Sequence, residues 1–172
     1  ALGSAAVARL DNIYIAAPYV WGVRTVSWTN YTAMAPNNSY NHNLYCAVEG
    51  GGLQNLQLDA ANPVVTINTE SYVALASEKL YDGNNLFWGN IVYGARADGG
   101  IDMCTRDNVL GWSTVRAEIG GVPIERKYVS MTTSGCTAGA PNPYHIFAVR
   151  QDGKGIDWLV FHPAVDEDPA YW

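Results

Sequence analysis

Two stretches of the sequence repeat an order of residues that could bind a polar ligand. Each stretch carries an Arg, an Asp-Gly turn and an Ile-Asp pair, over residues 96–102 and 150–157. Trp112 follows the first stretch, and Trp158 and Trp172 follow the second. A flat aromatic ring beside carboxylate or guanidinium groups suits a sugar, which has an apolar C–H face and a rim of hydroxyls. The candidate carbohydrate-binding residues are Trp112, Trp158, Trp172, Arg96, Arg150, Asp102 and Asp157.

Each of these residues also has a structural interpretation. The Trp rings could pack between sheets, and the Asp side chains could fix turns. A repeated turn repeats for structural reasons as well as functional ones. The pattern alone leaves both interpretations open for every single residue.

The sequence shows no catalytic or metal-binding motif. The spacing places no two carboxylates together as glycoside hydrolysis requires, and the His residues lack a His-x-x-x-His spacing. The three Cys lack the paired C-x-x-C spacing of a zinc site. We therefore assign no catalytic residue, no metal and no cofactor. A hydrolase whose acidic and His residues converge only in three dimensions stays an alternative.

The residues that could bind a ligand flank a hairpin that recurs three times. The copies lie at residues 43–54, 90–102 and 145–157, and each has an apolar strand, a Gly turn with Asp or Glu, and a second strand that opens on Leu or Ile. Asp-Gly and Gly-Gly supply the positive φ that tight hairpin turns need.

Another strand is expected upstream of each hairpin. The three β-like runs are residues 25–28, 72–75 and 128–131. The segments between these runs and the hairpins, notably 30–43 and 133–144, are rich in Asn, Pro and Gly and are predicted to be long loops.

The repeat predicts a single all-β domain over residues 1–172. Its three units cover about 20–60, 70–115 and 125–172. Units of this length must stack or close around an axis, because none can bury a face alone. A β-propeller-like assembly, a β-trefoil and a β-sandwich are the alternatives. A propeller needs about four or more blades, so three units would require a divergent extra blade or completion as a homo-oligomer.

The order of features in the third unit favours the propeller. From Gly111-Trp112 the chain runs through Tyr128-Val129-Ser130-Met131, the 146–149 strand and Asp152-Gly153 to Tyr171-Trp172. This resembles a blade of the fungal and bacterial propeller lectins, including the fucose-specific and tectonin-like groups. The resemblance covers residues 70–172, and residues 20–60 more loosely. It implies a propeller fold and glycan binding.

One departure limits what the resemblance implies. In the fucose-specific lectins, an Arg on the second strand and a Glu on the third hold the sugar. Here Ile91 and Ile146 stand at the second-strand positions, and Met103 and Trp158 stand where the Glu would fall. Specificity for fucose is therefore not implied.

The cysteines and the N-glycosylation sequons bear on whether the protein is secreted. Of the three Cys, we expect Cys104 and Cys136 to form a disulfide, while Cys46 lies in an apolar strand pattern and should be buried. Asn30 and Asn37 begin N-glycosylation sequons in one polar loop. The chain opens without Met, which suits a mature form cut from a precursor. Together these features predict a secreted protein.

Charge and hydrophobicity exclude several partners. The net charge is -6, with 10 Lys+Arg against 16 Asp+Glu, which disfavours nucleic acid and anionic membrane surfaces. No apolar run approaches the ~20 residues of a membrane helix. The leading hypothesis is a secreted lectin-like protein that gains affinity for glycans by multivalency. The alternatives are a secreted hydrolase acting on glycan or nucleic acid, and a non-catalytic effector or structural protein that binds another protein.

Overall fold

The described part of the chain consists of β-strands joined by turns and loops. The computed structural model describes residues 7–13, 20–27, 29–37, 43–57, 64–81, 87–107, 111–134 and 144–162. These residues contain no helix, and hence none long and apolar enough to cross a membrane. The all-β prediction is confirmed.

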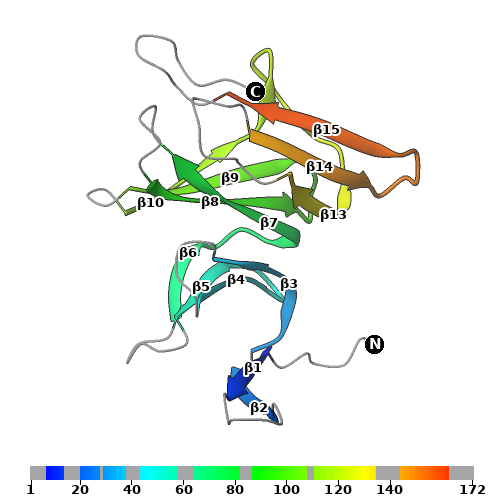
Figure 1. Cartoon of the computed structure of the whole chain (residues 1–172). Helices are drawn as coiled ribbons and strands as arrows, with labels where there is room; N and C mark the ends of the chain where they lie inside the picture. The colour runs from blue at the N-terminus through cyan, green and yellow to red at the C-terminus, as the bar shows by residue number, and fades with distance from the viewer. Residues whose placement is uncertain are drawn as a thin grey trace. The chain divides into compact units, whose positions relative to one another are not determined.

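The chain divides into two compact units, Ala1–Tyr31 and Thr32–Trp172. In the first unit, β1 (Val7–Ile13) pairs antiparallel with β2 (Val20–Ser27). Within its described residues, the second unit contains three antiparallel sheets of three or four strands, which follow one another along the sequence, and one two-stranded hairpin (Figure 1). The single domain predicted over residues 1–172 stays a prediction.

In every sheet of the second unit, strands that are consecutive in sequence are neighbours. The first sheet contains β3 (Tyr31–Pro36), β4 (Asn43–Val48), β5 (Leu53–Gln57) and β6 (Val64–Asn68). The second sheet contains β7 (Tyr72–Tyr81), β8 (Phe87–Arg96), β9 (Ile101–Asp107) and β10 (Gly111–Arg116). The third sheet contains β13 (Tyr128–Thr133), β14 (Tyr144–Arg150) and β15 (Ile156–Phe161). A short hairpin of β11 (Glu118–Ile119) and β12 (Val122–Pro123) precedes it.

The three predicted hairpins are confirmed as β4–β5, β8–β9 and β14–β15. In each one, the last residue of the first strand donates its N–H to the glycine carbonyl that closes the turn. Arg96 donates to Gly100 at 3.0 Å, and Arg150 donates to Gly155 at 3.0 Å. Gly100 has a φ of +86°, and an added Cβ there would meet the Ile124 carbonyl, so the turn requires glycine.

One predicted loop is wrong. Residues 31–36 form the strand β3, whereas 30–43 was expected to be a loop and 25–28 was expected to be the upstream strand. Residues 25–27 belong instead to β2 of the first unit. Tyr31 and Thr32, which begin β3, are of types that favour strands, whereas the Pro and Asn residues after them favour a loop. The Thr32 hydroxyl also donates to the Tyr72 carbonyl at 2.7 Å, a contact that no local pattern reveals.

A tyrosine at the start of the first strand holds the third strand in the second and third sheets. The Tyr72 hydroxyl donates to Asp102 Oδ2 at 2.8 Å, and the Tyr128 hydroxyl donates to Asp157 Oδ2 at 2.9 Å. We call each pair a Tyr–Asp clamp. Burial, together with the nearby carboxylate, raises the pKa of both hydroxyls, so both stay protonated as donors. The first sheet has Gln54 at the position of the aspartates.

The same backbone hydrogen bond joins each sheet to the next. The glycine that closes the turn donates its N–H to the carbonyl two residues before the next sheet begins. Gly52 donates to Glu70 at 2.9 Å, and Gly100 donates to Arg126 at 2.7 Å. We call this contact the docking bond. It fixes the start of each new sheet against the hairpin turn of the sheet before it.

A second contact repeats at the other end of the first strands. The Ser77 hydroxyl donates to the Pro36 carbonyl, and the Thr133 hydroxyl donates to the Ser77 carbonyl. The strands β7 and β13 accordingly lie side by side (Figure 1). These hydroxyl contacts thus recur between the first and second sheets and between the second and third.

Apolar side chains fill the two layers between these sheets. Tyr45 and Leu53 of the first sheet pack in a cluster that includes Tyr72 of the second. Between the second and third sheets, Ile101 packs in a cluster that includes Ile146. Burial of these faces is the main stabilising contribution to the stack.

The predicted Cys104–Cys136 disulfide is not seen. Cys104 is a free thiol, fully buried between the first and second sheets, where the Asn68 amide donates to its sulfur at 3.3 Å. Cys136 lies outside the described residues. Cys46 is buried as predicted. Burial raises the pKa of the Cys46 thiol to about 12 and that of Cys104 to about 11.

The two predicted glycosylation sites differ in exposure. Asn30 is exposed, and its glycosylation stays a prediction. Asn37 is only 6% exposed, and its amide nitrogen donates to Asn55 Oδ1 at 3.5 Å. Its glycosylation also stays a prediction.

Removing a clamp hydroxyl should destabilise the chain. We expect Tyr72→Phe to lower the free energy of unfolding by about 1.5–3 kcal/mol, because a buried carboxylate loses a hydrogen bond. Tyr128→Phe should cost less, since Asp157 is more exposed than Asp102. Urea denaturation of both variants measures the difference. A larger loss for Tyr128→Phe would contradict this ranking.

The buried thiols should be unreactive in the native chain. Iodoacetamide at pH 8 should leave Cys46 and Cys104 unmodified until guanidinium unfolds the chain, because both are buried and their pKa values lie far above 8. Peptide mass spectrometry detects the modification. If Cys104 reacts in the unfolded chain only after reduction, the disulfide exists after all.

Candidate functional site

The third sheet leaves open a face that the other sheets have covered. Beside the turn of the second sheet, the paired residues Ala95 and Ile101 are fully buried. The matching pair of the third sheet, Val149 and Ile156, is 38% and 64% exposed. Two residues further along β15, Trp158 lies on the same face and is 63% exposed. A large indole in this position is available to a ligand.

The neighbours of Trp158 set the orientation of its ring. Its Nε1–H donates to His145 Nδ1 at 2.9 Å. The Phe147 ring, which is opposite it in β14, lies nearly parallel, with an interplanar angle of 11° and ring centroids 6.4 Å apart. The indole is thus held in place before any ligand binds.

A pocket of about 450 Å³ lies between β15 and the β11–β12 hairpin, beside Trp158. Ile119 and Val122 of the hairpin form part of its apolar wall. Glu125, Arg126 and Asp157 supply charged groups to its lining. The pocket therefore combines an aromatic ring, an apolar wall, and both donors and acceptors of hydrogen bonds.

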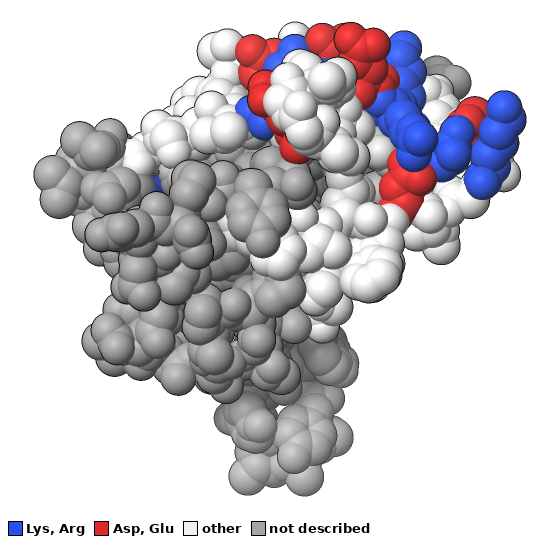
Figure 2. Space-filling view, turned by 90° about the horizontal axis from the view of Figure 1, so that it is seen from above, with Lys and Arg blue, Asp and Glu red and all other residues white. Residues whose placement is uncertain are grey.

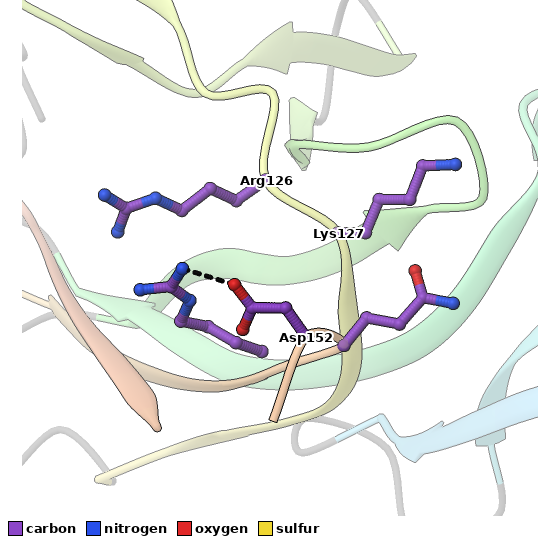
Figure 3. Close-up of a pocket in the computed structure, with 5 residues that line it drawn as sticks. Arg126, Lys127 and Asp152 are labelled. Atoms are coloured by element: carbon purple, nitrogen blue, oxygen red, sulfur yellow. Dashed lines mark hydrogen bonds and ion pairs between the residues drawn. The ribbon is translucent and has the colours of Figure 1, made fainter. Parts of the chain in front are cut away.

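A second pocket, of about 340 Å³, shares Arg126 with the first. Its lining also includes Lys127, Arg150, Gln151 and Asp152. Figure 3 shows Arg126 and Lys127 extending in opposite directions from neighbouring positions, with Asp152 between them in that view. The ion pair drawn there joins Arg150 to Asp152. Both pockets are lined by Arg126, and we treat them together as the candidate site.

Four charged groups in this site act on one another, and we call them the third-sheet charge cluster. They are Arg126, Arg150, Asp152 and Asp157. Burial by itself would raise the pKa of Asp157, but hydrogen bonds from Arg126 and Tyr128 and the charge of Arg150 outweigh it and lower that pKa. The Lys154 backbone N–H and the Arg150 guanidinium lower the pKa of Asp152. Both carboxylates are therefore ionised at neutral pH.

Three of the sequence-predicted residues come together here. Asp157 and Trp158 line the larger pocket, and Arg150 lines the smaller one. Figure 2 shows Lys and Arg side chains next to Asp and Glu on one part of the described surface. The assignment of Arg150, Asp157 and Trp158 to a ligand site stays a prediction, and the geometry is compatible with it.

The other predicted residues have structural contacts. Asp102 is buried in its clamp, and Arg96 binds it at 3.3 Å and Glu70 at 2.8 Å. The Trp112 ring meets Tyr45 edge-on, with centroids 5.8 Å apart. Trp172 lies outside the described residues.

The sequence interpretation missed Arg126. It stands two residues before the clamp tyrosine Tyr128, as Glu70 stands two residues before Tyr72. Aligning the repeats on these tyrosines would have revealed the change from Glu to Arg. The hairpins, which carry the clearest repeat in the sequence, begin well after this position.

The described residues contain no group of three or more His, Cys, Asp or Glu side chains that could hold a metal ion. Comparison with known proteins finds no matching family model and no matching curated protein. The function proposed below therefore depends on the chemistry of the side chains described above.

Proposed function

We propose that the chain binds carbohydrate at the open face of the third sheet. The observation that supports this most directly is the exposed and oriented indole of Trp158 at the edge of a pocket lined by charged groups. The apolar C–H face of a sugar ring would lie on the indole. Its hydroxyls would donate to Asp157 and accept from Arg126.

The arrangement of the site favours such binding. The Trp158 ring is held by His145 and Phe147, so little side-chain entropy remains to be lost when a sugar binds. The ion pair of Arg126 with Asp157 uses one guanidinium nitrogen, Nη1. A sugar hydroxyl can therefore reach N–H groups of Arg126 without breaking the pair.

We further propose that the three sheets belong to a propeller-like assembly. The docking bond supports this, because it relates the second and third sheets as it relates the first and second. An added Cβ at Gly155, the turn glycine of the third sheet, meets no described atom within 4 Å. A second copy of the chain could supply a sheet at this place. Such a homo-oligomer would gain affinity by presenting several sites.

Binding of another protein is a second candidate function. Ile119 and Val122 are 63% and 66% exposed and line the same pocket as Ile156 and Trp158. A contiguous apolar patch of this kind is typical of protein interfaces. Secretion stays a prediction.

Trp158→Ala should weaken the binding of a glycan by about tenfold or more, because the stacking surface is lost. A glycan array with the native chain identifies the ligand, and isothermal titration compares the variants. Met34→Ala, which truncates an exposed side chain of the first sheet, is the matched control and should bind as the native chain does.

Two results would contradict these proposals. If the native chain binds no glycan on the array, the carbohydrate proposal fails. If sedimentation finds only monomer at all concentrations tested, completion as a homo-oligomer fails while carbohydrate binding by the single chain still stands.

A further inference from the structure

The second and third sheets carry the same charged positions, which allows a direct comparison. Arg96 and Arg150 end the second strand of each sheet, and each pairs with the Asp two residues later. The clamp aspartates Asp102 and Asp157 also correspond. The remaining position, two residues before the clamp tyrosine, is Glu70 in the second sheet and Arg126 in the third.

In the second sheet, carboxylates outnumber guanidinium groups. Arg96 contacts Glu70 at 2.8 Å, Asp98 at 2.8 Å and Asp102 at 3.3 Å. Arg116 also approaches Asp102, at 3.7 Å. Three carboxylates thus surround two guanidinium groups, and this cluster offers nothing to an anion.

In the third sheet, cations outnumber carboxylates in the lining of the smaller pocket. Arg126 contacts Asp157 at 2.9 Å, and Arg150 contacts Asp152 at 2.5 Å. Lys127 adds a third cation to the lining of the same pocket. Within the described residues its ammonium group forms no ion pair or hydrogen bond. Three cations and one carboxylate, Asp152, therefore line this pocket, in a chain whose net charge is -6.

The two arginines act on a common set of carboxylates. Arg150 contributes to lowering the pKa of Asp157, and Asp152 contributes to raising the pKa of Arg126. Each guanidinium has five N–H donors, and each ion pair uses one nitrogen. The remaining donors suit a planar or tetrahedral anion, which guanidinium groups bind with two hydrogen bonds at once.

We propose that the carbohydrate ligand is acidic, and that its carboxylate or sulfate group binds in the pocket lined by Arg126 and Arg150. This rests on the carbohydrate-binding function proposed above. A sugar ring next to the anionic group lies in the adjoining pocket, against Trp158. The change from Glu to Arg at one repeat position accounts for why only the third sheet has such a site among the described residues.

The test compares ligands that differ only in charge. Oligogalacturonate and its methyl ester share one sugar backbone, and a sulfated oligosaccharide and its desulfated form test the other anion. We expect one of the acidic forms to bind the native chain about tenfold or more tightly than its neutral form at low salt. This preference should shrink as salt is added.

Two substitutions at one position test the role of Arg126. Arg126→Glu restores the charge pattern of the second sheet and should abolish the preference for the acidic form. Arg126→Gln should reduce it and avoids placing a new carboxylate beside Asp157. Arg106→Glu makes the same charge change at an exposed position at the other end of β9 from the turn, and should keep the preference. Urea denaturation checks that each variant is folded.

The outcomes separate the two proposals. If the native chain binds acidic and neutral forms equally, the acidic-ligand inference is overturned while carbohydrate binding stands. If the folded Arg126→Gln and Arg126→Glu variants both keep the full preference, the inference is also overturned. If no saccharide of any kind binds, carbohydrate binding itself fails, and the acidic-ligand inference fails with it.

Discussion

The docking bond between a turn glycine and the start of the next sheet is the constraint on which the described arrangement of the second unit depends. A glycine N–H must reach a backbone carbonyl across the gap between two sheets, and at Gly100 any side chain would prevent this approach. The bond ties each hairpin turn to the point where the following sheet begins. Because both partners are backbone groups, side chains around the bond can differ between sheets without changing it.

The Tyr–Asp clamp has the complementary role within a sheet. It joins the first strand to the third across the middle strand, so the hairpin cannot tilt away from the strand that precedes it. The buried tyrosine hydroxyl and the aspartate each gain a hydrogen-bond partner in the clamp, which offsets the cost of burying them. The first sheet, with Gln54 in place of the aspartate, is packed through Tyr45 and Leu53 instead.

The hairpins could be predicted from the sequence because their cause is local. A glycine with positive φ between two apolar runs is visible in a short window, and all three turns formed as expected. The strand β3 could not be predicted in this way, since Thr32 is anchored by a carbonyl 40 residues away. The Cys104–Cys136 bridge was expected because Cys46 alone lies in a clearly apolar strand pattern, whereas the burial of Cys104 depends on which face of β9 is covered by the first sheet.

The sequence predicts only the part of the candidate site whose residues lie close together in the chain. Trp158, Asp157 and Arg150 belong to one hairpin, so their proximity follows from its register. Arg126 and the β11–β12 hairpin come from a separate stretch of chain and reach the site only through the fold. Asp102, which occupies the position of Asp157 in the second sheet, is buried because that sheet has neighbours on both faces.

Asp157 accepts hydrogen bonds from both Arg126 and Tyr128, and this has a consequence for how the sequence of such a protein can diverge. Tyr128 donates to this carboxylate in addition to Arg126, and residue 126 lies in an exposed segment outside any strand. A substitution at 126 therefore alters the surface potential of the site while the scaffold keeps its internal support. Repeats built in this way allow one copy to acquire a new ligand preference by drift at a single tolerant position, with little selective cost to folding.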